Sequence, residues 1–184
     1  MKTTFLLFTA IIGMSLSSCK KGAQGPRGEK GEPGAPAGQA SSFLYTAQEI
    51  APTTDLGYDE GSGMQTWSGS KDFIPQGYTA AVNNGIVLVY FRSGANDGWH
   101  LSTMTTSRKE ANESVSTNVY TAVLEKDKIR INAVSRSVFT DGQYLNSSKF
   151  DLKVVVIKAV AVPEVSSHVN VNSLAEVERY YGLK

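Results

Sequence analysis

Two apolar runs, Ile86-Val87-Leu88-Val89-Tyr90-Phe91 and Val154-Val155-Val156-Ile157, decide the fold of this chain. Both are continuous, rich in β-branched residues and bounded by turn-forming residues, a pattern typical of strands that are buried on both faces. We expect the second run to continue through Val160 and Val162 as far as Pro163. The two runs therefore predict two fully buried strands.

The segment between these runs predicts a hairpin. Residues 119–124 and 129–134 each alternate in the period of two that favours a strand with one face on the core. The polar residues 125–128 between them predict the turn. Weaker strand signals follow the same reasoning at Phe43–Gln48, Met64–Trp67, Trp99–Met104 and Ser137–Phe139.

Helical signals are few. Gln76 to Asn84 predicts a short turn that Gly85 closes as a left-handed cap. Ser173-Leu174-Ala175-Glu176 fits a capping box, the apolar residues Leu174, Val177 and Tyr181 share one face, and Gly182 ends the helix. Many short strands with little helix predict a mainly β fold, an antiparallel β-sandwich with a short C-terminal helix.

Residues 1–18 have the layout of a secretory signal peptide, with Lys2 before an apolar run that ends in small serines. The run is shorter than the roughly 20 residues that a spanning helix needs. Leu16-Ser17-Ser18-Cys19 resembles a bacterial lipobox, although serine replaces the usual Gly or Ala before the cysteine. Cys19 is the only cysteine, and acylation by palmitate or a similar chain accounts for it and anchors the protein in a membrane. Lys20 favours the outer membrane by analogy with lipoprotein sorting, with the face left open.

Residues 19–40 continue from the lipidated cysteine as a collagen-like stalk. Glycine recurs at every third position, as Gly-X-Y repeats require, until Ala37 breaks the phase. Five triplets suit either an extended spacer of a single chain, about 45 Å long, or a short trimeric stalk. Both a monomer and a stalk-mediated homotrimer therefore remain open. The stalk glycines are Gly22, Gly25, Gly28, Gly31 and Gly34.

Residues 41–184 form the predicted sandwich domain, long enough for one core. They hold 13 Lys and Arg against 15 Asp and Glu, a net charge of −2. Proteins that bind nucleic acid need a basic face, so nucleic acid is not an expected partner. The missing second cysteine means that no internal disulfide supports this domain.

The lipobox, the short stalk and the β domain together resemble the collagen-triplet lipoproteins of Bacteroidota-type bacteria. The resemblance rests on the stretches 83–90 and 150–157 as well as on the N-terminal layout. It implies an envelope location and a C-terminal β domain. It implies no activity, since these motifs are structural. The resemblance does not extend to the Gly-rich insertion from Asp55 to Gly69 or to the C-terminal helix.

Candidate chemistry is sparse. His100 and His168 have no second histidine or cysteine at metal-ligand spacing, so we expect no metal, cofactor or catalytic residue. Asp55, Asp59 and Glu60 share a predicted Gly-rich loop whose spacing does not match a calcium loop. We expect that loop to be solvated.

Aromatic residues give the one hint of a binding surface. Trp67 and Trp99 adjoin Gly-rich segments, and Tyr58 and Tyr144 lie in predicted loops. Such side chains at a sandwich end stack on sugars or dock protein partners, because they combine an apolar ring with a polar group. The alternative is that both tryptophans fill the core.

Three functions follow as hypotheses. The first is a non-catalytic, membrane-anchored lipoprotein that displays a sandwich for binding a glycan or a protein. The second is a structural surface protein organised by a trimeric stalk. The third is a hydrolase with an unrecognised carboxylate pair, a separation that sequence cannot reveal.

Overall fold

The two apolar runs form neighbouring strands of one antiparallel sheet. A computed structural model of the chain describes residues 39–111, 113–139, 141–161 and 169–183. In it, β4 (Ile86–Arg92) pairs along its whole length with β9 (Phe150–Ile157). β9 also pairs with β1 (Ala40–Gln48), and β4 pairs with the short β5 (His100–Leu101). This four-stranded sheet has the order β1-β9-β4-β5.

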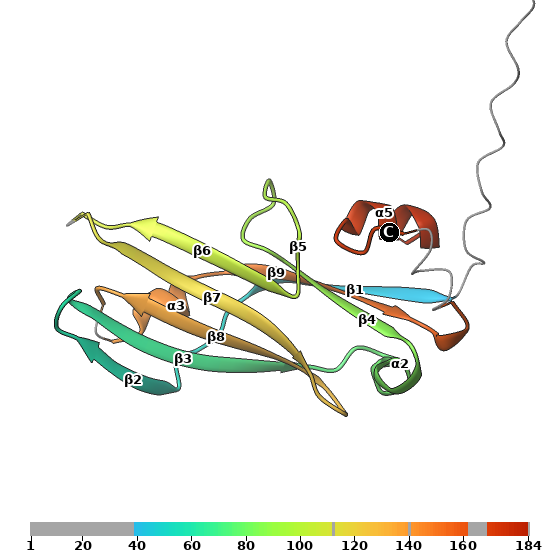
Figure 1. The fold of residues 1–184 in the computed structure, drawn as a ribbon, viewed down its shortest axis with the longest axis horizontal. Helices are drawn as coiled ribbons and strands as arrows, with labels where there is room; N and C mark the ends of the chain where they lie inside the picture. Colours follow the sequence, from blue (N-terminus) through green and yellow to red (C-terminus); the bar gives the residue numbers. More distant parts are fainter. Residues whose placement is uncertain (1–38, 112, 140, 162–168, 184) are drawn as a thin grey trace, which may run out of the picture. The chain divides into compact units, whose positions relative to one another are not determined.

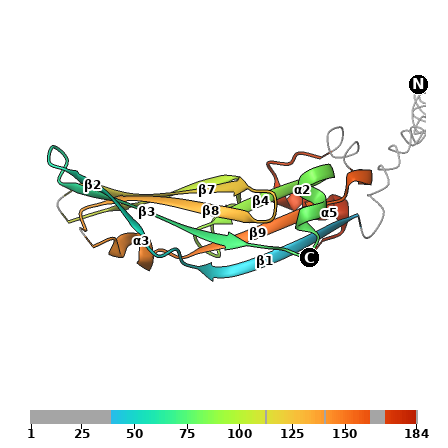
Figure 2. The ribbon, with the colours of Figure 1, turned by 90° about the horizontal axis from the view of Figure 1, so that it is seen from below.

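A second sheet has the order β2-β3-β8-β7-β6. The predicted hairpin is its β7–β8 pair, in which Val119 lies opposite Val134. The two sheets face each other as the layers of a sandwich, which confirms the predicted fold (Figures 1 and 2). The strands of this sheet are β2 (Thr54–Asp59), β3 (Met64–Phe73), β6 (Thr103–Lys109), β7 (Val115–Leu124) and β8 (Ile129–Ser137).

The core fills the space between the sheets. Alternate residues of β9 and β8 point into it, as the period-two pattern of the hairpin predicts. Phe150 joins the two layers, because its ring centroid lies 5.9 Å from that of Phe91 and 4.8 Å from that of Tyr120. The other inward residues of β9 and β8 include Leu152, Val154, Val156, Ile129, Ile131 and Ala133.

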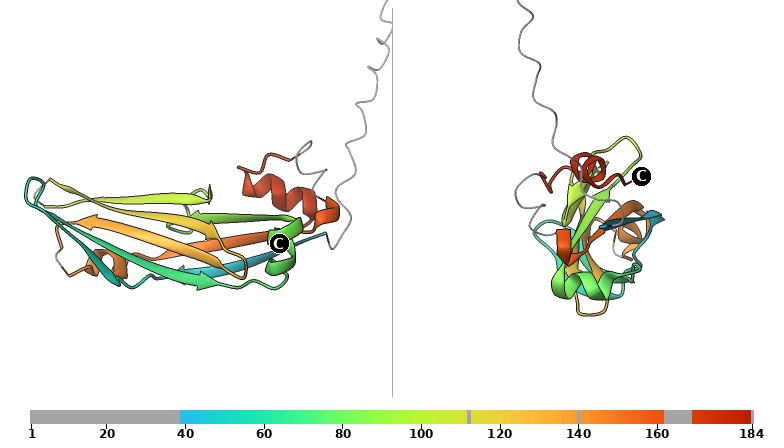
Figure 3. Two further views of the ribbon diagram at one scale, coloured as in Figure 1. Left: turned by 60° about the horizontal axis from the view of Figure 1, so that its bottom comes forward. Right: turned by 90° about the vertical axis from the view of Figure 1, so that its right-hand side faces the viewer.

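Helix α5 (Leu174–Tyr181) covers the opposite face of the four-stranded sheet (Figure 3). Its buried face of Leu174, Val177 and Tyr181 packs with residues of β4 and β9. This third layer explains why both strands are apolar on both faces. The predicted C-cap is confirmed, because Gly182 is left-handed (φ 63°). The predicted capping box is confirmed in one half: the Ser173 side chain accepts from the Glu176 N–H, whereas the Ser173 N–H donates to the Asn170 carbonyl. In the parts of the chain that the structure describes, no helix has the length and apolar character to cross a membrane.

Three shorter helical elements complete the described chain: α2 (Tyr78–Asn84), α3 (Gln143–Ser147) and the 3₁₀ turn η1 (Ala159–Ala161). The predicted left-handed cap at Gly85 is wrong. That residue is extended (φ −121°, ψ −150°), because it leads directly into β4 and lies against the backbone of Ile157. The predicted continuation of the last strand is also wrong, since β9 ends at Ile157 and the chain turns into η1.

Three other predicted segments differ from the structure. The weak strand from Trp99 to Met104 is divided into β5 and β6 at Ser102, which has a positive φ of 64°. The weak strand at residues 137–139 is only the end of β8. The insertion from Asp55 to Gly69 is a hairpin and not a loop, because β2 pairs with β3 around a bulge at Gly57 (φ 107°).

Two buried tyrosines predict a loss of stability in alkali. Burial raises the pKa of both Tyr90 and Tyr120 from 10.0 to about 12. The folded state therefore holds these protons more tightly than the unfolded state. Their stabilising contribution is complete below pH 10 and is lost as the pH rises through 12. We expect the free energy of unfolding to fall by roughly 1–2 kcal/mol per tyrosine across this window.

Urea unfolding at successive pH values, with phenolate absorbance recorded in parallel, measures this loss. The Tyr90→Phe variant should have a shallower pH dependence because phenylalanine does not titrate. An equally steep decline in that variant would assign the alkaline loss to other groups.

Candidate functional site

The predicted anchor and stalk lie outside the described residues. Cys19 and the glycines from Gly22 to Gly34 therefore stay predictions. The described domain begins at Gln39, and its first strand at Ala40, three residues beyond the break in the triplet phase at Ala37.

The structure does not gather the four predicted ligand-stacking residues on one surface. Tyr58 is exposed (55%) on β2, near the tip of the β2–β3 hairpin. Trp99 is partly buried against the apolar residues that helix α5 covers. The central carbon of the Arg92 guanidinium lies 4.5 Å from the centroid of the Trp99 ring. Trp67 lies on β3 with its indole nitrogen buried. Tyr144 was predicted in a loop and is instead buried (6% exposed) in helix α3.

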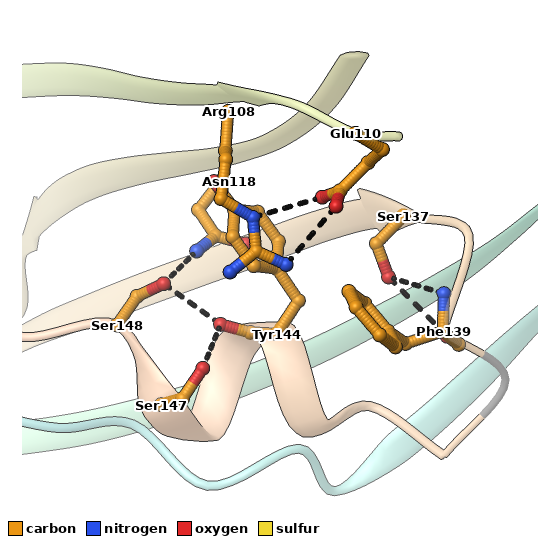
Figure 4. Close-up of polar contacts among 8 residues, drawn as sticks. All are labelled: Arg108, Glu110, Asn118, Ser137, Phe139, Tyr144, Ser147 and Ser148. Carbon is orange, nitrogen blue, oxygen red and sulfur yellow. Dashed lines mark hydrogen bonds and ion pairs between the residues drawn. The ribbon is translucent and has the colours of Figure 1, made fainter. Parts of the chain in front are cut away.

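Arg108 links β6 to the segment that carries Tyr144 (Figure 4). Its guanidinium lies 4.9 Å from the Tyr144 ring centroid and 5.3 Å from that of Phe139. It also donates to both carboxylate oxygens of Glu110, at 3.0 and 3.2 Å. An arginine that stacks on aromatic rings and forms a bidentate ion pair with a carboxylate has its charge satisfied within the protein. The cluster therefore fastens α3 to β6 and leaves no free cation for a ligand.

Four carboxyl groups of the described domain act in ion pairs and turns that lower their pKa values. The pKa of Asp72 is lowered to about 2 by hydrogen bonds from Arg130 and Lys128. The pKa of Asp151 is lowered by the Ala47 N–H and by Arg92. The pKa values of Asp59 and Glu110 are also lowered, in each case first by a serine hydroxyl, from Ser62 and Ser116 respectively. A general acid of a glycosidase needs a raised pKa, so none of these four groups is a candidate.

The residues considered for metal binding are spread apart. Asp55 and Asp59 belong to β2 and not to a loop; the Asp55 carboxylate accepts from the side chain of Gln65, and Asp59 pairs with Arg136 at 2.6 Å. His100 is exposed on β5, while His168 lies outside the described residues. Across the described ranges, no three His, Cys, Asp or Glu side chains are grouped so that they could hold a metal ion.

The outer face of the five-stranded sheet carries two neutral rows of side chains. The strand register aligns the first row across five strands and the second across four. Charged residues lie only beyond them, with Arg136 on one side and Arg130 and Asp72 on the other. We call these the neutral rows: Thr54, Ser68, Val134, Val119 and Thr105 in the first, and Ser70, Asn132, Thr121 and Thr103 in the second.

A groove of about 360 Å³ opens at the end of these rows that lies toward β2. Gly69 and Ala133 contribute to it between the two rows, and Val134 supplies an exposed apolar surface. The size suits a small ligand or one segment of a longer one. We call it the Asn132 groove, and its polar lining consists of Thr53, Thr54, Ser68, Ser70 and Asn132.

Sequence reasoning missed this face because it searched for aromatic and titratable residues. A usable signal was present in the hairpin, where Val119, Thr121 and Val123 alternate with Tyr120 and Ala122. That alternation identifies an outward face of short neutral side chains. The alternation does not reveal which side chains of β3 and β6 lie beside these residues, because the register between distant strands depends on tertiary packing.

The comparisons with known proteins give no assignment. No family model matches the chain, and no curated protein or solved structure matches it.

Proposed function

We propose that this chain is an envelope lipoprotein that carries a non-catalytic β-sandwich on a collagen-like spacer, and that the sandwich binds a neutral glycan. The resemblance to collagen-triplet lipoproteins and the lipobox at Cys19 support the location. The binding role rests on one observation, the Asn132 groove within the neutral rows.

The chemistry of this surface favours a neutral ligand rich in hydroxyl groups. The amide of Asn132 offers both a donor and acceptors, and each serine or threonine hydroxyl does the same. Val119 and Val134 are paired across strands and are 39% and 43% exposed, so they present an apolar surface for the C–H faces of sugar rings. A charged ligand would find no counter-ion within the rows, because Arg136, Arg130 and Asp72 lie outside them. Asp59 and Asp72 neutralise these two arginines.

Substitutions in the groove test this proposal. We expect Asn132→Ala to weaken binding of a neutral oligosaccharide about tenfold, since a hydrogen-bonded amide contributes roughly 1–1.5 kcal/mol. Val134→Arg should abolish binding because it places a long charged side chain across the groove. The matched control is Val115→Arg, an exposed β7 position beyond the neutral rows. Calorimetry of the full chain against a panel of neutral glucans, mannans and galactans provides the measurement.

Equal binding by the Val115→Arg and Val134→Arg variants would contradict the groove as the site. Failure of every neutral glycan to bind would contradict the ligand class. If Val134→Arg then abolished capture of a purified protein partner, the same face would be a protein-docking surface.

The lipid anchor has its own test. We expect the mature protein to begin at Cys19, with acyl chains on this residue, and to partition with membranes. Mass spectrometry of the N-terminal peptide measures the modification, and Cys19→Ser should release the protein from the membrane fraction. An unmodified thiol at Cys19 would refute the anchor without affecting the glycan proposal.

A further inference from the structure

The inner face of the five-stranded sheet carries a row of polar side chains near α3. Register places Trp67 of β3 opposite Ser135 of β8, Ser135 opposite Asn118 of β7, and Asn118 opposite Thr106 of β6. We call these four residues the inner polar row. They lie on the face opposite the neutral rows, so the row is separate from the proposed glycan site.

Four atoms of this row, one from each residue, are buried without a hydrogen-bond partner among the described residues: Trp67 Nε1, Ser135 Oγ, Asn118 Oδ1 and Thr106 Oγ1. Asn118 is 0% and Ser135 1% exposed. Asn118 Nδ2 donates to Ser148 Oγ at 2.7 Å, which sets the orientation of the amide and leaves Oδ1 as its unused acceptor. The row therefore presents a donor at Trp67, hydroxyls at Ser135 and Thr106, and an acceptor at Asn118.

The spacing of the strands explains why these groups do not bond to one another. Adjacent strands lie about 4.8 Å apart, and the serine side chain is too short to span that distance. Two hydrogen bonds of about 2.8 Å that meet at one tetrahedral oxygen join atoms about 4.6 Å apart. One small hydroxyl-bearing molecule between each pair of strands would therefore complete the row. Buried polar atoms without protein partners are commonly satisfied in this way.

We propose that the inner polar row is a binding site for small neutral hydroxyl-bearing molecules, which accept from Trp67 Nε1 and donate to Asn118 Oδ1. Water and a small polyol share this chemistry. An ionic ligand does not suit the site, because the row itself carries no charged side chain.

Neighbouring residues enclose the site. Tyr120 is fully buried beside it; Asn118 and Ser148 lie close enough to affect the pKa of its hydroxyl, yet that hydroxyl makes no hydrogen bond of normal geometry with them. Gly142 begins helix α3 (φ 70°), and a methyl group there would lie 3.1 Å from Trp67 Cδ2. The start of α3 therefore lies directly on the indole, which accounts for the burial of this end of the sandwich.

The indole N–H of Trp67 reports on the site in the full chain purified in detergent. In ¹H–¹⁵N spectra, Trp99→Phe identifies the Trp67 resonance because the chain has two tryptophans. We expect a cross-peak between this N–H and a long-lived water, or a saturable shift of the resonance as glycerol or erythritol is added. The first result assigns water as the occupant and the second a polyol. Absence of both would overturn the proposal.

Ser135→Ala supplies a second readout, with Ser107→Ala on the exposed face of β6 as the matched control. If the row holds bound molecules, Ser135→Ala should lower Tm by about 3 °C and weaken the water or polyol signal at Trp67. If the row is dry, removing an unpartnered buried hydroxyl should raise Tm relative to the control, and the proposal fails. Neither outcome depends on glycan binding at the Asn132 groove.

Discussion

Gly69→Ala should destabilise the sandwich by about 3 kcal/mol, because the added methyl group would overlap with neighbouring backbone. A Cβ atom at Gly69 would lie 2.2 Å from the carbonyl oxygen of Ala51 and 2.9 Å from Ile50 Cγ2. The first contact is with backbone, so rotation of a side chain cannot relieve it. The chain from Ile50 to Thr53 must move away from β3, and the hydrogen bond from the Thr53 N–H to the Ser68 carbonyl (2.8 Å) is strained with it.

The matched control is Gly98→Ala. A methyl group at Gly98 meets no atom within 4 Å, and this position does not have a left-handed backbone. We expect its free energy of unfolding to change by less than about 0.5 kcal/mol, or to rise slightly because alanine restricts the unfolded chain. Chemical denaturation of the two variants measures the difference. Similar values for Gly69→Ala and Gly98→Ala would contradict the close approach of residues 50–53 to β3.

The second large effect concerns the ion pair between Lys153 of β9 and Glu178 of α5. Lys153 interrupts the apolar sequence of β9 on the face that α5 covers, and its side chain is 10% exposed against 26% for Glu178. We expect Glu178→Gln to destabilise the protein by about 2 kcal/mol, because it leaves a nearly buried ammonium group without a counter-charge. The measurement is again denaturant unfolding, with near-UV circular dichroism to follow the packing of α5.

Two further variants make this result specific. Glu113→Gln applies the same change to an exposed pair with Lys109 and should cost less than about 0.5 kcal/mol. Adding Lys153→Met to Glu178→Gln should recover most of the lost stability, because the buried charge is then absent. No recovery in the double variant, or equal losses at positions 113 and 178, would show that α5 is not held by a buried charge pair.

The parts of the fold that could be predicted are those with strong local signals. The two apolar runs, the β7–β8 hairpin and the capped helix from Leu174 to Tyr181 each carry a periodicity or a cap that does not depend on distant residues. Strand β2 was missed because its residues Thr54–Asp59 are all exposed and include the bulge at Gly57. Helix α3 was missed because its single turn has no side-chain cap, and Tyr144 was consequently assigned to a loop.

Candidate sites were harder to predict, because each joins residues from strands that are distant in sequence. Asn132 and Ser70 share the groove only through the register between β3 and β8. Trp67 is an aromatic residue beside glycine, and nothing local tells whether it faces a ligand or the interior. The register between β3 and β8 places Trp67 opposite Ser135, and the start of α3 covers the indole ring.

The sequence by itself therefore determined the β class, the two central strands, the C-terminal helix and, as a prediction, the acylated Cys19 with its Gly-X-Y stalk. These features depend on contacts between residues a few positions apart, which a local pattern records. The tertiary structure alone decided which faces are covered: α5 buries Lys153 beside Glu178, while the neutral rows stay open around Asn132. Which face is covered depends on strand order and register, and these arise from packing between segments such as β1 and β9, which are more than a hundred residues apart.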